Sequence, residues 1–372
     1  MINLVRLFAV ARKEAIQLRR DAKSLAMAFV LPVFLLIMFG YAITWDVEDI
    51  ATGVIDYDNS ARSRELLEAF RSSGYFTIRE HLTDASAIGP SLERNRMEIV
   101  LVVPPDFASD LDAGRPTQVQ AIVDGSDANT ATIIIGYARA IVEMYSARVR
   151  LTGIPMTPPL VVQSRVWYNE DLKSRNMIVP GLIAVIMMII AAMLTSLTIA
   201  REWERGTMEQ LAATPVARVE VVLGKLLPYV AIGLIDVVVC AACGLLLFGV
   251  PLRGSPFLLL GLSFFFLVGA LGLGMFISAF ARSQLLATQI SMIVTFLPAY
   301  LLSGFMFSID VMPKALRAIT YVVPARYFLV VTRGIFLKGV GVHVLFIQGL
   351  LMIAFALIGL SLATRVFKKE LR

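Results

Sequence analysis

The sequence predicts a membrane α-helical protein with six transmembrane helices and an inserted extracytoplasmic α/β domain. First, 58% of its 372 residues are hydrophobic and only 17% are charged, whereas soluble domains have about 45–50% apolar and about 25% charged residues. Second, the apolar residues are gathered in runs of about 20, the length that a helix needs to cross a bilayer. Third, residues 45–175 contain no such run and alternate short β-like segments with polar helical ones.

The charged residues are divided unequally between these parts. Residues 46–175 contain 19 acidic and 13 basic residues, a net charge of −6, and the rest contains 9 acidic and 21 basic residues, a net charge of +12. A basic membrane part and an acidic soluble part are typical of a protein that faces two compartments. The net charge of +6 therefore does not indicate nucleic-acid binding.

Residues 1–23 predict an amphipathic helix at the cytoplasmic interface. Its apolar positions recur with helical spacing at Leu4, Leu7, Phe8, Ala11, Ala15 and Leu18. Basic residues such as Arg6, Lys13 and Arg20 lie mostly on the other side, so the helix can lie along the cytoplasmic leaflet. The alternative is a hydrated extension of the first span, although Asp21 and Lys23 interrupt the chain before the next apolar run.

Residues 24–44 predict the first transmembrane helix. Pro32 lies inside it, which membrane helices tolerate because neighbouring groups satisfy the freed carbonyl. The run is longer than the core of a signal peptide, about 7–15 residues, and no clear cleavage site follows it. We therefore expect an uncleaved anchor.

Residues 45–175 predict the extracytoplasmic α/β domain, because strand-like and helix-like segments alternate along it. Strands are expected at Thr52–Asp56, Tyr75–Arg79, Glu98–Val103, Gln118–Val123 and Val161–Tyr168, and helices at Ser60–Arg71, Asp106–Leu111 and Asn129–Arg150. The proline-rich stretch 151–160 is expected to be a stiff linker or loop.

Residues 176–372 predict a five-helix transmembrane region, with apolar runs at 176–200, 219–249, 257–280, 283–307 and 343–365. Basic residues accumulate at 1–23, 201–225, 281–283 and the C-terminal tail, which share one side if the spans alternate. The positive-inside rule then places both termini in the cytoplasm. Residues 308–342 fall on the outer side although they carry five basic residues, and we expect an outer re-entrant or hairpin segment there. Either a gate or a simple capped hairpin fits this segment.

The turn 201–215, which we call the coupling segment, is predicted to be a rigid corner between two spans. Gly206 can end the preceding helix in a left-handed conformation. Thr207 can then cap a short helix with Gln210 completing a capping box, and Thr214 followed by Pro215 can start the next span. The segment is expected to present Glu202, Glu204, Arg205 and Glu209 to the cytoplasm, unless it is an ordinary capped loop.

The coupling segment contains a motif with a known counterpart. Glu202, Glu204, Gly206, Thr207, Glu209, Leu211, Thr214 and Pro215 form the pattern E-x-E-x-G-T-x-E-x-L-x-x-T-P, which resembles the signature of type-2 ABC exporter permeases. The stretches VIDYDNSARSRELLEAF, IVLVVPPDFASDL and VDGSDANTA resemble the domain that one subgroup carries after the first span, and MPKALRAITYVVPARYF resembles the region between its last two spans.

This resemblance covers essentially the whole chain and implies a bacterial inner-membrane permease that dimerises on two separate ABC ATPase subunits, which would bind ATP and Mg. It implies a coupling helix that docks on those subunits through Arg201, Glu202, Glu204, Arg205, Gly206, Thr207, Glu209, Leu211, Thr214 and Pro215. The amphipathic helix would also contact them. In Gram-negative members a periplasmic adaptor protein often completes the pathway, and the cargo would be hydrophobic drugs or lipid-like molecules.

The chain lacks a phosphate-binding loop of its own. No G-x-x-x-x-G-K-[ST] occurs, and the nearest fragment, Gly224-Lys225, belongs to a span. Together with the resemblance, this absence predicts a transporter subunit whose ATP is bound by another chain. No G-x-S-x-G, HExxH or His/Cys/Asp cluster at ligand spacing occurs either, so we expect no cofactor or metal in this chain, and its charge distribution does not indicate nucleic-acid binding. The isolated His81 and His343 are expected to be surface or interface residues rather than ligands.

Asp236 lies inside the third span, where a carboxylate is costly unless it faces the bundle or water. It is either a cargo or proton site or a hydrogen-bonded helix contact. Cys240 and Cys243 are expected to pack between helices. The glycines of the fourth span, Gly261, Gly269, Gly272 and Gly274, predict close helix packing, either within one protomer or across a dimer.

Two other functions fit the sequence. A membrane-anchored sensor or structural protein would act through the domain at 45–175, and its coupling segment would be dispensable. A proton-driven secondary transporter would need Asp236 or another buried carboxylate.

Overall fold

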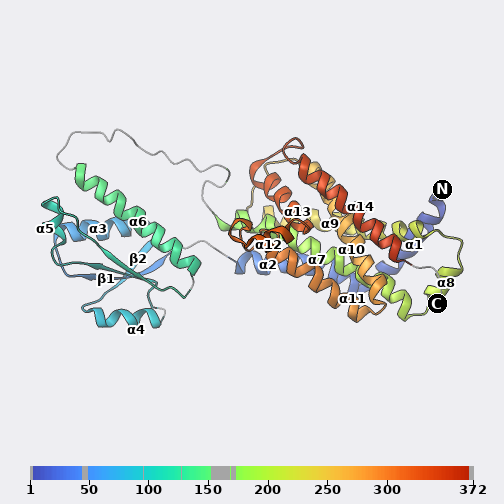
Figure 1. The fold of residues 1–372 in the computed structure, drawn as a ribbon, viewed down its shortest axis with the longest axis horizontal. Helices are drawn as coiled ribbons and strands as arrows, with labels where there is room; N and C mark the ends of the chain where they lie inside the picture. The colour runs from blue at the N-terminus through green and yellow to red at the C-terminus, as the bar shows by residue number, and fades with distance from the viewer. Residues whose placement is uncertain are drawn as a thin grey trace. The chain divides into compact units, whose positions relative to one another are not determined.

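A computed structural model of the chain describes residues 3–43, 49–94, 96–126, 128–151, 168 and 173–367. The chain divides into two compact units. The membrane unit comprises Met1–Thr44 and Arg165–Arg372, and the inserted unit comprises Trp45–Ser164. Each unit is described by itself below (Figure 1).

Among its described residues, the inserted unit forms a small four-stranded sheet in the order β2-β1-β3-β4. Its strands are β1 (Ile50–Asp56), β2 (Phe76–His81), β3 (Ile99–Val103) and β4 (Gln120–Val123). β1 pairs in parallel with both β2 and β3, whereas β3 pairs antiparallel with β4. The helices are α3 (Ala61–Ser72), α4 (Ile88–Glu93), α5 (Phe107–Asp112) and α6 (Ala128–Leu151), with a short 3₁₀ turn, η1 (Ala85–Ala87).

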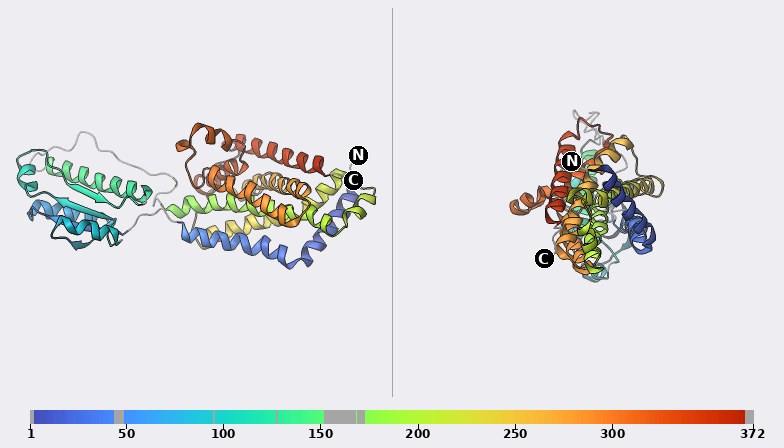
Figure 2. Two further views of the ribbon diagram at one scale, coloured as in Figure 1. Left: turned by 60° about the horizontal axis from the view of Figure 1, so that its bottom comes forward. Right: turned by 90° about the vertical axis from the view of Figure 1, so that its right-hand side faces the viewer.

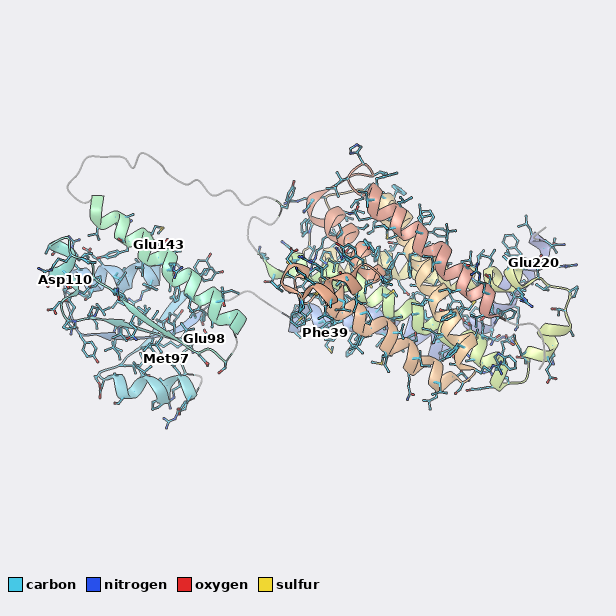
Figure 3. The ribbon with its side chains drawn as sticks, in the orientation of Figure 1. Phe39, Met97, Glu98, Asp110, Glu143 and Glu220 are labelled. Carbon is cyan, nitrogen blue, oxygen red and sulfur yellow. The ribbon has the colours of Figure 1, made fainter. Side chains whose placement is uncertain are left out.

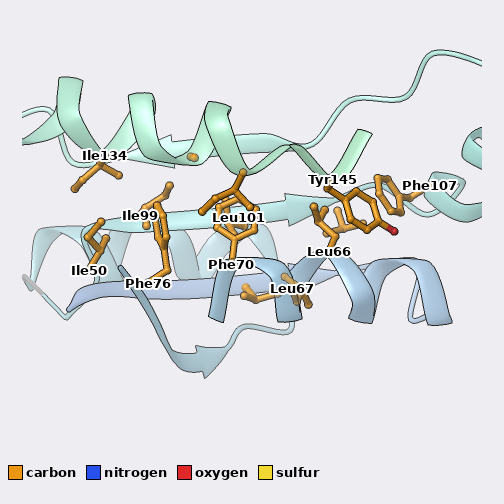
Figure 4. Close-up of a cluster of buried hydrophobic side chains, with 14 residues drawn as sticks. Ile50, Leu66, Leu67, Phe70, Phe76, Ile99, Leu101, Phe107, Ile134 and Tyr145 are labelled. Atoms are coloured by element: carbon orange, nitrogen blue, oxygen red, sulfur yellow. The ribbon is translucent and has the colours of Figure 1, made fainter. Parts of the chain in front are cut away.

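The two faces of the sheet carry separate cores. α3 and α6 cover one face, where Phe70 of α3 and Ile134 of α6 pack with strand residues such as Leu101 (Figure 4). α4 covers the other face with a smaller cluster that includes Ile88 and Val100. Because β1 and β3 are buried on both faces, their sequences are nearly continuous apolar runs.

Most local predictions for this unit are confirmed. The first four predicted strands and the three predicted helices each occur within about two residues of the expected bounds. Ser60 caps α3, since its hydroxyl oxygen accepts a hydrogen bond from the amide of Ser63. The predicted linker 151–160 and the last predicted strand, Val161–Tyr168, lie outside the described residues apart from Leu151 and Tyr168.

The membrane unit is helical, and its described residues include six helices long and apolar enough to cross a membrane, as predicted. These candidate spans are Ser24–Ala42, Ser174–Glu204, Arg218–Leu246, Pro256–Ala281, Gln284–Leu302 and Phe346–Val366. They correspond to α2 (Ala22–Ala42), α7 (Ser174–Glu204), α9 (Arg218–Leu246), α10 (Pro256–Ala281), α11 (Gln284–Ser291) with the π-helical turns η2 (Met292–Phe296) and η3 (Pro298–Leu302), and α14 (Phe346–Val366).

α7 is the central helix of this unit. It packs against α2, α9, α10 and α11, and almost all of its apolar stretch is buried. The other spans keep many apolar side chains exposed, among them Phe34, Ile235 and Leu357, which is the pattern expected for surfaces facing lipid or a second membrane helix.

The glycines of α10 bring helices together within one chain. A Cβ on Gly272 would lie 2.7 Å from the carbonyl carbon of Gly359 in α14, and a Cβ on Gly274 would lie 2.3 Å from the carbonyl oxygen of Ala192 in α7. Only a residue without a Cβ permits these approaches. Packing within one chain is therefore observed at Gly269, Gly272 and Gly274, whereas a Cβ on Gly261 would meet no described atom of this chain within 4 Å.

Residues 308–342 form short helices rather than a straight span. They contain η4 (Ile309–Val311), α12 (Lys314–Thr320), α13 (Pro324–Arg333) and the π-helical turn η5 (Gly334–Lys338). α12 and the helical stretch Pro324–Lys338 are bent by 76° relative to each other, as in a broken span or re-entrant loop. Pro313 precedes α12, and Pro324 is the first residue of α13.

Three of the five basic residues of this segment, Arg317, Arg326 and Arg333, have partners in the structure. Arg317 pairs with Asp310 at 2.7 Å, and the guanidinium of Arg326 lies 4.2 Å from the ring centre of Tyr321. Arg333 donates to the carbonyl oxygen of Met177 at 3.3 Å. These three guanidinium groups are therefore held by contacts within the membrane unit.

Candidate coupling surface

The coupling segment forms the corner predicted for it. α7 ends at Glu204, and Gly206 has a φ of 68°, the left-handed conformation expected after a helix C-terminus. The amide of Gly206 donates to the carbonyl of Trp203 at 3.2 Å, which closes the last turn. Thr207 then precedes the short helix α8 (Met208–Ala213), whose backbone includes Glu209 and Leu211.

The prediction that the next helix starts at Thr214 and Pro215 is wrong. α9 begins at Arg218, and Ala217 occupies the position before it. The carboxylate of Glu220 accepts the amide hydrogen of Ala217 at 2.8 Å and also that of Asn3 at 2.7 Å. α9 therefore starts at a position where the carboxylate of Glu220 can accept hydrogen bonds from both amides.

The side chains of the coupling segment differ in exposure. Those of Glu204, Arg205 and Glu209 are exposed, as predicted, and Thr214 and Pro215 are also exposed. Arg201 and Thr207 are half-buried. The expectation that Glu202 faces the cytoplasm is wrong, because only 4% of this residue is exposed.

Glu202 is buried because it belongs to an ion network with α1 (Leu4–Arg20) and α9. Lys13 lies 2.6 Å and Lys225 lies 3.1 Å from the same Glu202 oxygen. Lys225 also lies 2.9 Å from Glu14, whose other carboxylate oxygen accepts the hydroxyl hydrogen of Tyr229 at 3.2 Å. Two carboxylates and two ammonium groups thus balance one another in a mostly buried site, as buried charges require.

The network is possible because α1 packs closely on α9. Leu7, Ala11, Glu14 and Leu18 form the buried stripe of α1. A Cβ on Gly224 of α9 would lie 2.9 Å from the carbonyl oxygen of Leu7. α1 is therefore an amphipathic helix, as predicted, but its buried stripe includes Glu14, whereas Leu4 and Phe8 of the predicted apolar face are exposed.

α1 contacts the coupling segment at both ends. Beyond the pair of Lys13 with Glu202, the guanidinium of Arg6 donates to the carbonyl oxygen of Pro215, and Asn3 bonds to Glu220 as described above. Figure 3 labels Glu220 at the end of the bundle where α1 begins and where α8 lies. α1 thus braces the coupling segment on each side of α8.

A second set of contacts joins the end of α7 to α2 and α11. Arg201 pairs with Asp21 at 2.8 Å, in the bend between α1 and α2 that Figure 2 shows. Glu204 accepts the amide hydrogen of Gln284, the first residue of α11, at 2.7 Å. Burial acts to raise the pKa of Asp21, but hydrogen bonds from Ser24 and the charge of Arg201 outweigh it, so that pKa lies below its ordinary value.

Asp236 lies in α9 and is only 2% exposed. Its Oδ2 has no hydrogen-bond partner in the part of the chain that the structure describes. Cys240, one turn further, is buried, and Cys243 is half-buried. Among the described residues, no group of three or more His, Cys, Asp or Glu is arranged to hold a metal ion.

Sequence reasoning missed Lys13, Glu14 and Lys225 as partners of the coupling segment. One signal was present, because Lys225 stands inside the apolar run 219–249, where an ammonium group needs a buried partner. The sequence alone did not identify that partner, since Glu14 is 211 residues away.

Comparison with known proteins agrees with this architecture. The family model described as "ABC-2 family transporter protein" matches residues 22–365. The chain is 36% identical to "Probable multidrug ABC transporter permease YbhS" of Escherichia coli K12, over 98% of this chain and 97% of that protein. It is 31% identical to "Probable multidrug ABC transporter permease YbhR", over 90% of each chain. It is also 27% identical to "Inner membrane transport permease YhhJ" of the same organism, over 86% of this chain and 85% of that protein.

The family match spans nearly all of the membrane unit and the inserted unit, and YbhS aligns over almost its whole length. The chain is therefore a member of the ABC-2 transporter family, a permease of the ABC exporter type.

Proposed function

We propose that this chain moves hydrophobic drugs or lipid-like molecules out of the cytoplasm or the inner leaflet, using ATP hydrolysed by separate ABC ATPase subunits. The relatives YbhS and YbhR, whose names describe multidrug permeases, support this cargo class. The absence of a phosphate-binding loop from this sequence supports ATP and Mg binding by a partner chain.

The coupling segment carries the mechanical part of the proposal. Glu209 is exposed on α8 and can meet an ATPase surface, whereas Arg201 and Glu202 hold the corner to α2 and α1. Motion imposed on α8 would then reach the spans through α7 and through the brace formed by α1. The single observation that carries this proposal is the buried contact of Glu202 with Lys13 and Lys225.

The proposed topology follows from the distribution of basic residues. The chain would be a multi-pass protein of the bacterial inner membrane with both termini in the cytoplasm, and the inserted unit would be an extracytoplasmic α/β domain. A second permease copy would complete the transport path, and a periplasmic adaptor protein would bind on the outer side. YhhJ, whose name places it in the inner membrane, supports the location.

Affinity purification from the native membrane tests the complex directly. We expect an ATPase chain with a phosphate-binding loop to co-purify with the wild type. Glu209→Lys should abolish both this co-purification and transport-coupled ATP hydrolysis. Glu143→Lys, the same charge change at an exposed position of α6, is the control and should change neither. Isolation of the chain alone, with no response to ATP, would contradict the proposal.

Asp236 supports a second candidate function, proton-driven secondary transport, because its carboxyl group is buried with one oxygen unpartnered among the described residues. Such a transporter needs this carboxyl to exchange a proton. Transport that persists in Asp236→Asn and still requires ATP would exclude the proton-driven mechanism at this residue.

A further inference from the structure

A cleft lies at one end of the membrane unit, between α1, α2, α7 and α11. It encloses about 780 Å³. Its lining residues are Lys13, Ile16, Gln17, Arg20, Asp21, Ser24, Met27, Leu197, Arg201, Arg205 and Gln284. Ser24 and Gln284 begin candidate spans, and Arg201 lies in the last turn of another. The cleft therefore lies where apolar helix surface meets water.

The lining is strongly basic. It contains four cations, Lys13, Arg20, Arg201 and Arg205, and one carboxylate, Asp21, a formal net charge of +3. Lys13 and Arg201 already have carboxylate partners. Arg20 and Arg205 are exposed, and neither forms an ion pair with a residue that the structure describes. Two guanidinium groups therefore remain available to an anion.

The other lining residues make the cleft amphipathic. Ile16, Met27 and Leu197 supply apolar surface, and all three are at least partly exposed. Arg201 is held in place, since it donates to Ser24 at 3.3 Å and pairs with Asp21 at 2.8 Å. A guanidinium fork is suited to bidentate binding of phosphate.

We propose that this cleft binds the phosphate headgroup of an anionic phospholipid, with Arg20 and Arg205 on the phosphate and the apolar lining along the upper acyl chain. Basic pockets between helices at the membrane boundary bind such headgroups by this combination of charge and apolar contact. The proposal requires only that the chain spans a membrane, and it does not depend on the proposed export function. A bound lipid would contact both α1 and the end of α7.

Binding can be measured on the purified full chain in mild detergent by native mass spectrometry, with dioleoylphosphatidylglycerol as the probe and dioleoylphosphatidylcholine as the neutral comparison. We expect a phosphatidylglycerol complex that Arg20→Gln/Arg205→Gln weakens roughly 30-fold, given about 1 kcal/mol for each cation near an anionic membrane. The matched control is Arg12→Gln/Arg19→Gln, which removes the same charge from exposed positions outside the cleft and should retain the affinity of the wild type.

Three outcomes would overturn the proposal. If both double variants lost the same affinity for phosphatidylglycerol, the attraction between α1 and anionic lipid would be unspecific. Equal binding of the neutral and anionic lipids would remove the role of the phosphate charge and the guanidinium groups. Displacement of the lipid by inorganic phosphate at the same concentration, with equal thermal stabilisation by both ligands, would identify a site for free phosphate rather than for a lipid.

Discussion

The ammonium group of Lys225 lies 2.9 Å from the carboxylate of Glu14, and both side chains are at least 96% buried. The two residues are 211 positions apart in the sequence, so this pair fixes the N-terminal helix to the third span. Lys225 reaches Glu202 as well, which places one cation between α1 and the end of α7. The position of α1 and that of the coupling segment are therefore linked through one side chain.

Lys225→Met tests this link. It leaves Glu14 without its cation in a buried site, and removing one partner of a buried pair costs about 3–5 kcal/mol. We expect a clearly lower midpoint of thermal unfolding in detergent. Lys13→Met is the control, because the Lys13 side chain is 51% exposed and such a pair contributes at most about 1 kcal/mol. If the midpoint of thermal unfolding fell equally in the two variants, the burial of Lys225 would have no special role in stability.

Gly224→Ala tests the close approach of α1 to α9. Replacing glycine with alanine normally stabilises a helix by about 1 kcal/mol. Here its Cβ would lie 2.9 Å from the carbonyl oxygen of Leu7, so α1 must move away. We expect faster amide hydrogen exchange along α1 despite the higher helix propensity. Leu227→Ala, at an exposed position of the same helix, should leave this exchange unchanged. Unaltered exchange in Gly224→Ala would contradict the packing.

Gly272→Val tests the contact between α10 and α14. The new side chain would meet the backbone of Gly359, which cannot yield as a flexible side chain can. Overpacking of this kind costs about 1–3 kcal/mol. Gly261→Val in the same helix enters open space and is the control. We expect only Gly272→Val to lower the midpoint of thermal unfolding. Equal midpoints in the two variants would argue against close packing of α10 on α14 within one chain.

The features that the sequence predicted correctly depend on residues close together along the chain. The six spans follow from runs of apolar residues, and the corner at Gly206 follows from one residue that tolerates a positive φ. The four described strands follow from short apolar runs between turn residues.

The features that could not be predicted depend on distant contacts. Glutamate is a residue type usually found at the surface. The burial of Glu202 requires a cationic partner such as Lys13, which is 189 positions away. α9 starts at Arg218, where the carboxylate of Glu220 accepts the amide hydrogens of Ala217 and of the distant Asn3, and Glu220 lies outside the motif at 201–215. The cleft beside Arg20 and Arg205 requires four helices to meet, so no single stretch of sequence indicates it.

Tyr145 gives a pH-dependent prediction for the inserted unit. This residue of α6 is buried, and its hydroxyl donates to the carbonyl oxygen of Arg62 at 3.0 Å. Burial, followed by the charge of Glu65, raises the pKa of Tyr145 above its ordinary value. The folded unit thus favours the neutral phenol. Its contribution to stability is fully present below the unfolded pKa of about 10 and is lost as the pH rises through the higher folded value.

Tyr145→Phe should therefore flatten the alkaline loss of stability. At neutral pH we expect the variant to be less stable by about 1 kcal/mol, because one buried hydrogen bond is missing and the carbonyl of Arg62 loses its donor. Above about pH 10 the difference from the wild type should shrink, since only the wild type must ionise this phenol on unfolding. Scanning calorimetry of the full chain between about pH 8 and pH 11 measures both effects. A difference that stays constant over this range would show that Tyr145 does not titrate with the raised pKa that its burial implies.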